Sequence, residues 1–88
     1  MSGFEHYNRE LRDIDHEIAR WAVVCGIDPT DVVQVEACRK ERRTVHGTDH
    51  PYENLRGLLL LRLKLEAEMI ELGMVPRPYA PPAEVHAG

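Results

Sequence analysis

The chain has 88 residues, of which 43% are apolar and 30% charged, a balance typical of a soluble globular domain. Its net charge of −4 disfavours broad binding to nucleic acid or to acidic membranes. No apolar run reaches the length of a membrane span and the first ten residues are polar, so we expect neither a membrane protein nor a secreted one. Two cysteines, Cys25 and Cys38, are too few for a disulfide framework, and we therefore expect a cytoplasmic protein.

The first segment, about residues 3–25, is predicted to be a helix. Glu5 stands three residues after Ser2, as in a capping box, and Gly26 suits the left-handed position that follows a helix. The apolar residues recur at alternating intervals of three and four, the spacing of a coiled-coil seam: Phe4, Tyr7, Leu11, Ile14, Ile18, Trp21 and Cys25.

A second, shorter helix is expected over about residues 29–45. Asp28 followed by Pro29 is typical of an N-cap and the first helical residue. The valines at the beginning of this segment would also fit a strand, but a lone strand would have no partner in this chain. Its second half, from Arg39 to Thr44, contains no apolar residue and is expected to be solvated on all sides.

A third helix is predicted over about residues 51–72, from Pro51 to the residue before Gly73. A row formed by Leu59, Leu63 and Ile70 accompanies its main seam, which again has intervals of three and four: Leu55, Leu58, Arg62, Leu65, Met69 and Leu72. Residues 76–88 contain four prolines and are expected to form an extended, mobile tail after a single helical domain over residues 1–75.

These elements predict an all-α domain in which two long antiparallel helices are joined by a shorter one. The third helix has more apolar surface than one narrow seam covers. We therefore expect the row of Leu59, Leu63 and Ile70 to pack against a second copy or another protein, completing a helical bundle with Arg62 and Glu66 fixing its register. Two alternatives remain open: the second helix covers this row in a monomer, or Arg62 and Glu66 face a ligand in a cavity. Counter-charges for Arg62 are available on the first helix: Asp13, Asp15 and Glu17.

The sequence favours a protein–protein interaction module without enzymatic activity and without a cofactor. Its single serine, Ser2, and the absence of a glycine-rich phosphate loop leave no nucleophile or nucleotide site of a familiar kind. Two alternatives are a metal site formed by His46, Asp49 and His50, and a nucleic-acid-binding helix end. That helix end carries the basic cluster of the chain: Arg39, Lys40, Arg42 and Arg43.

One stretch of the first helix resembles the opening of the all-helical chorismate mutases over eight residues: Leu11-Arg12-Asp13-Ile14-Asp15-His16-Glu17-Ile18. In that family the helix continues into an arginine and a lysine that bind the substrate. Here the corresponding stretch, 21–26, ends the helix, so the resemblance implies a substrate-binding role for Arg12 only. We assign no family on this basis.

Overall fold

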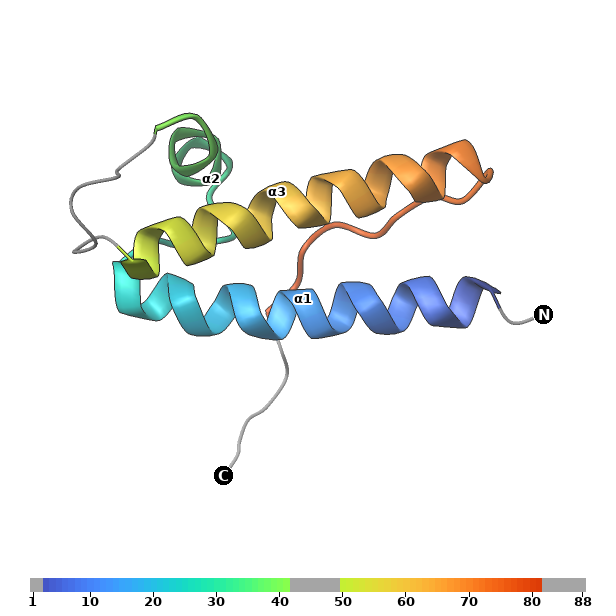
Figure 1. The fold of residues 1–88 in the computed structure, drawn as a ribbon, viewed down its shortest axis with the longest axis horizontal. Helices are drawn as coiled ribbons and strands as arrows, with labels where there is room; N and C mark the ends of the chain where they lie inside the picture. Colours follow the sequence, from blue (N-terminus) through green and yellow to red (C-terminus); the bar gives the residue numbers. More distant parts are fainter. Residues whose placement is uncertain (1–2, 42–49, 82–88) are drawn as a thin grey trace, which may run out of the picture.

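Three α-helices and an extended C-terminal segment form the part of the chain that the computed structural model describes, residues 3–41 and 50–81. The helices are α1 (Gly3–Cys25), α2 (Val32–Lys40) and α3 (His50–Glu71). In Figure 1, α1 and α3 run antiparallel along each other, and α2 lies beside the first half of α3. The described residues contain no strand, and the predicted all-α fold is confirmed.

The seam between α1 and α3 contains two apolar clusters, one toward each end of the helix pair. The first also takes in Cys38 of α2 and is formed by Ile18, Ala22, Cys38, Tyr52, Leu55 and Leu59. The second is formed by Leu11, Leu65 and Met69. Between the two clusters, each long helix places a buried charged residue, Asp15 on α1 and Arg62 on α3. The predicted heptad seams therefore do face each other, with one polar level inside them.

Both long helices end in the same way, with a glycine in the left-handed conformation. Gly26 has φ 71° and Gly73 has φ 84°. After α1, the N–H of Ile27 donates to the carbonyl of Ala22 at 3.0 Å, and after α3 the N–H of Met74 donates to the carbonyl of Met69 at 2.9 Å. These are Schellman caps, in which the residue after the glycine packs back on the helix. Ile27 and Met74 accordingly pack against the first and the second apolar cluster.

The second helix is shorter than predicted at both ends. Its N-cap is Asp31, whose carboxylate accepts from the N–H of Val33 at 3.0 Å, so the predicted cap at Asp28 is corrected. Asp28 instead accepts from the N–H and the hydroxyl of Thr30, at 2.9 and 2.7 Å, and these bonds close a turn before the helix. At the other end, Glu41 has extended backbone, so α2 ends before the predicted position near 45.

The segment after α3 turns back along the helix pair (Figure 1). Its described part forms neither helix nor strand, as its prolines predict, and Tyr79 packs against the first apolar cluster. This docking of residue 79 differs from the mobile tail expected over 76–88, of which residues 82–88 lie outside the described residues. None of the three described helices is long and apolar enough to cross a membrane.

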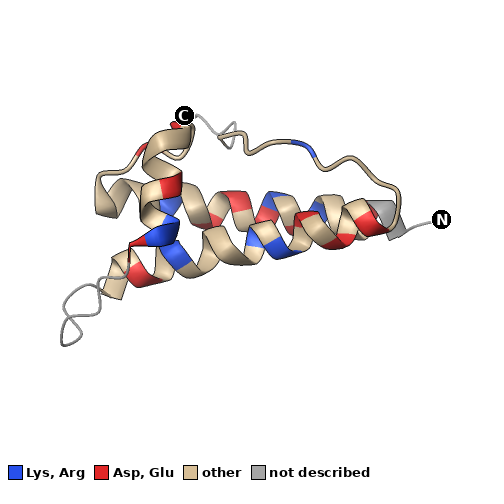
Figure 2. Cartoon of the chain, turned by 90° about the horizontal axis from the view of Figure 1, so that it is seen from above, with Lys and Arg blue, Asp and Glu red and all other residues tan. Residues whose placement is uncertain are grey.

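Charged residues are distributed unevenly over the two ends of the molecule. Figure 2 shows acidic and basic residues interspersed along α1 and α3, and basic residues together where the end of α2 meets α3.

At the junction of α2 and α3, Nε of Arg56 donates to the carbonyl oxygen of Arg39 at 3.0 Å. This bond fastens the C-terminal end of α2 to the first half of α3. Among the described helices, only α1 therefore lies beside the second half of α3.

Two glycine substitutions should change the stability in opposite directions. Gly26→Ala should lower the free energy of unfolding by about 1–2 kcal/mol, because alanine resists the left-handed conformation. Gly57→Ala should raise it by about 0.5–1 kcal/mol, because Gly57 lies inside α3 and an added Cβ meets no atom within 4 Å. Chemical denaturation followed by circular dichroism measures both, and a shift of the same sign would contradict this account.

Candidate functional site

A buried ion pair connects the two long helices at the middle of their seam. Nε of Arg62 donates to Oδ1 of Asp15 at 2.7 Å, and Nη2 of Arg62 lies 3.3 Å from Oδ2 of the same carboxylate. The two side chains are 6% and 4% exposed. A bidentate arginine–carboxylate pair of this kind fixes the angle and the height at which the two helices meet.

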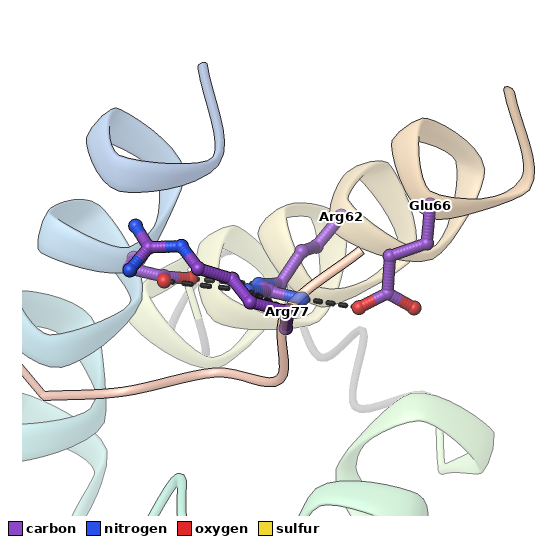
Figure 3. A network of polar contacts seen from close by, with 4 residues as sticks. Arg62, Glu66 and Arg77 are labelled. Atoms are coloured by element: carbon purple, nitrogen blue, oxygen red, sulfur yellow. Dashed lines mark hydrogen bonds and ion pairs between the residues drawn. The ribbon is translucent and has the colours of Figure 1, made fainter. Parts of the chain in front are cut away.

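The same guanidinium holds two further groups (Figure 3). Nη1 of Arg62 donates to Oε2 of Glu66, one turn further along α3, and Nη2 donates to the carbonyl oxygen of Arg77 at 3.2 Å. Arg62 therefore joins α1, α3 and the C-terminal segment through one side chain. Asp15 was one of three candidate counter-charges in the sequence, whereas the carbonyl of Arg77 had no sequence signal.

Tyr79 lies close to this network. Burial raises the pKa of its hydroxyl above the usual value near 10, the carboxylates of Asp15 and Asp28 raise it further, and the positive charge of Arg62 partly opposes them. The neutral phenol is thus the form that suits its docked position. A lone aromatic residue within a proline-rich tail was the one sequence signal for this contact.

A cleft of about 210 Å³ lies next to the network, between α2, α3 and the C-terminal segment. The charged groups on its wall are already engaged within the chain, since Arg62 binds Asp15 and Glu66, and Arg39 pairs with Glu36 at 3.1 Å. The remainder of the wall is apolar: Ile18, Pro29, Val35, Leu59, Leu63, Pro78 and Tyr79. The cleft therefore offers a shape but no unpaired charge on the described residues to select a ligand.

An apolar stripe on the outer side of α3 is the other candidate. Leu60, Leu63, Ala67 and Ile70, which we call the outer stripe, follow one another at intervals of three, four and three. All four are exposed, and the three large side chains are 39%, 46% and 61% exposed in chain order. Residues at this spacing share one helix face, and here neither α1 nor α2 covers it. Leu63 belongs to both candidates, because it also borders the cleft.

The structure separates the residues that the sequence placed in one interface. Leu63 and Ile70 are exposed as expected, but Leu59 and Arg62 are buried inside the chain at 7% and 5% exposure. These two residues therefore serve the core and are not available to a partner, and Glu66 is turned toward Arg62. The alternative that α2 covers the whole row is also excluded, because α2 reaches only its first member.

The outer stripe includes two residues that the sequence analysis did not single out, Leu60 and Ala67. Their signal was present in the spacing, because Leu60 and Ala67 complete the alternation of three and four around Leu63 and Ile70. The sequence analysis instead grouped Leu63 with Leu59, because these two residues are four positions apart and such residues lie on the same helix face.

The two alternative sites receive no support from the described residues. His50 is exposed at the first position of α3, and no group of three or more metal-binding side chains occurs within 3–41 and 50–81. His46 and Asp49 lie outside that part. Of the basic cluster, Arg39 and Lys40 both pair with Glu36, at 3.1 and 3.8 Å, while Arg42 and Arg43 lie outside the described residues.

Comparisons with family models, with curated proteins and with solved structures match no family, protein or structure to this chain. Arg12, the residue that the resemblance to chorismate mutases would make substrate-binding, is exposed on α1. Asp15, in the same stretch, is engaged by Arg62 in the seam between the long helices. The function must therefore be inferred from the surfaces and contacts described above.

The buried ion pair gives a double-mutant prediction. Asp15→Ala should lower the free energy of unfolding by about 3–5 kcal/mol, because it leaves the Arg62 guanidinium buried without its main partner. The double variant Asp15→Leu with Arg62→Met should be clearly more stable than Asp15→Ala, because it removes both charges and retains apolar volume. Urea denaturation of the three proteins measures this, and a double variant less stable than Asp15→Ala would contradict a paired role.

The raised pKa of Tyr79 predicts a loss of stability at alkaline pH. Because the pKa of the docked tyrosine is higher than that of the unfolded chain, its contribution is fully present below about pH 10 and is lost as the pH rises through the raised pKa. The free energy of unfolding should therefore fall more steeply above about pH 10 in the native protein than in Tyr79→Phe. Equal slopes in the two proteins would show that docking does not raise the pKa of Tyr79 above its value in the unfolded chain.

Proposed function

We propose that this protein is a small helical interaction module, without catalytic activity, that assembles with another chain through the outer stripe of α3. The observation that supports the proposal is the exposure of four apolar residues in coiled-coil spacing on a helix whose other side is packed. A contiguous apolar surface of this kind on a small domain is typical of a protein–protein interface. A cytoplasmic location belongs to the same proposal, since it rests on the cysteine count.

Assembly also answers a physical need of the chain. A domain of this size buries only ~60% of the surface that its unfolded chain exposes, so its stability as a monomer is marginal. Each fully buried leucine or isoleucine side chain contributes about 1.5–3 kcal/mol. Covering Leu60, Leu63 and Ile70 would therefore add an amount comparable with a substantial part of a small domain's stability.

The outer stripe is a better candidate for the functional surface than the cleft. Ligand pockets combine an apolar wall with a few polar groups that are free to fix the ligand. In the cleft, the charged side chains already have partners within the chain. Arg62 binds Glu66 and the carbonyl oxygen of Arg77. Arg39 pairs with Glu36. The outer stripe has no such requirement, because a partner helix needs only complementary apolar side chains.

A site-specific photo-crosslinking experiment tests the proposal with a matched pair of positions. Leu63 in the outer stripe and Leu61 outside it are 46% and 50% exposed, and they lie about 200° apart around the helix. A photoreactive residue at 63, introduced into the full chain in its native host, should give a protein adduct on irradiation. The same residue at 61 should give about tenfold less adduct or lower, because it faces away from the partner.

Two results would contradict the proposal. An adduct at 61 in place of 63 would move the interface to the opposite side of α3, where Leu61 lines a shallow groove with Trp21 and Leu58. No adduct at either position would show that this helix has no protein partner. Circular dichroism of both variants serves as the control for folding.

A further inference from the structure

We propose that the partner of the outer stripe is a second copy of this chain, lying antiparallel to the first, with α3 against α3 and the twofold axis at the level of Leu65. This inference rests on the proposed function and names its partner. Three independent features of α3 support it: the order of the apolar residues, the extent of α2 and the order of the charges.

The order of the apolar residues is self-complementary. The intervals of three, four and three read the same in both chain directions, so an antiparallel copy centred on the outer stripe meets it in register. Leu60 then lies opposite Ile70 of the second copy, and Leu63 lies opposite Ala67 of the second copy. A large side chain facing a small one allows two helices to approach closely and to interdigitate, which is how a twofold interface achieves tight packing.

The extent of α2 fits the same register. The cluster that α2 shares with α3 includes α3 residues up to Leu59, six residues before Leu65. Helix α3 itself ends at Glu71, six residues after Leu65. In the antiparallel pair, Glu71 of the second copy is therefore level with Leu59 of the first. The α3 helix of the second copy ends where the contact between α2 and α3 starts, so each α2 helix fits beyond the end of the opposing α3 helix. A parallel pair would place both α2 helices at the same end.

The order of the charges favours the antiparallel direction. Lys64 lies on one flank of the outer stripe, followed along that flank by Glu68 and Glu71. In an antiparallel pair, residues on the same flank of the two helices face each other. Each Lys64 then lies about 3 Å along the axis from Glu68 of the second copy and equally far from its Lys64. The two lysine–glutamate attractions outnumber the single lysine–lysine repulsion. On the second flank, Glu66 is bonded to Arg62 of its own chain, so its charge is compensated before the copies meet.

The size of this interface makes the association sensitive to concentration. The outer stripe spans eleven residues from Leu60 to Ile70, a rise of about 15 Å along the helix. Such a contact is small compared with a standard stable interface. We therefore expect a dimer that dissociates on dilution.

Sedimentation of the purified full chain over a concentration series tests the partner. The native protein and Leu61→Glu should form the same dimer, while Leu63→Glu should raise the dissociation constant by about tenfold or more, because its carboxylate would be buried against Ala67. Circular dichroism should show all three proteins equally helical. A native protein that remains monomeric at every concentration would overturn the inference.

Disulfide crosslinking tests the direction. In the antiparallel pair, two Cys residues at 60 are about 15 Å apart along the axis, beyond the reach of about 7 Å between disulfide-bonded Cα atoms. Leu60→Cys and Ile70→Cys chains should therefore crosslink rapidly when mixed, and neither should crosslink with itself beyond the level of the native protein, which controls for Cys25 and Cys38. Self-crosslinking of each variant would indicate a parallel pair and overturn the proposed direction.

The two proposals fail in different ways. A monomeric purified chain together with an adduct at position 63 to a different protein would overturn the second copy as partner and leave the proposed function standing. A monomeric chain with no adduct at 63 would overturn both.

Discussion

The guanidinium of Arg62 is the group on which the arrangement of this small domain depends. It lies between two apolar clusters and meets Asp15 at the same level of the neighbouring helix. Sliding α3 along α1 by one turn would press both charged side chains against apolar neighbours, and an unpaired buried charge is very costly. The ion pair therefore excludes other alignments of two heptad seams that hydrophobic contact by itself would tolerate.

The same guanidinium also organises the surface around it. By donating to the carbonyl of Arg77, it holds the C-terminal segment beside α3, where Tyr79 closes one side of the cleft. By binding Glu66, it compensates an acidic side chain at the edge of the outer stripe. A bond that aligns two helices thus also shapes the charge at the edge of the exposed face of α3.

The length of α2 has an equally direct consequence. Two helices of more than twenty residues form the seam, but α2 has nine residues and covers only the first half of α3. The second half keeps an apolar face that one more helix could cover. For a chain of 88 residues with limited core volume, covering that face by association is a physically economical way to gain stability.

The sequence by itself determined the helical class, the bounds of the two long helices and their antiparallel contact, because alternating intervals of three and four mark a helix face wherever the helix lies. Gly26 and Gly73 likewise ended their helices as predicted, since the left-handed conformation is a local property. Only the tertiary structure decided that Leu59 is buried and Leu63 exposed, that Asp15 is the counter-charge of Arg62, and that Tyr79 docks. These outcomes depend on where α2 ends and on which residues of distant segments meet, and no periodicity within one helix carries that information.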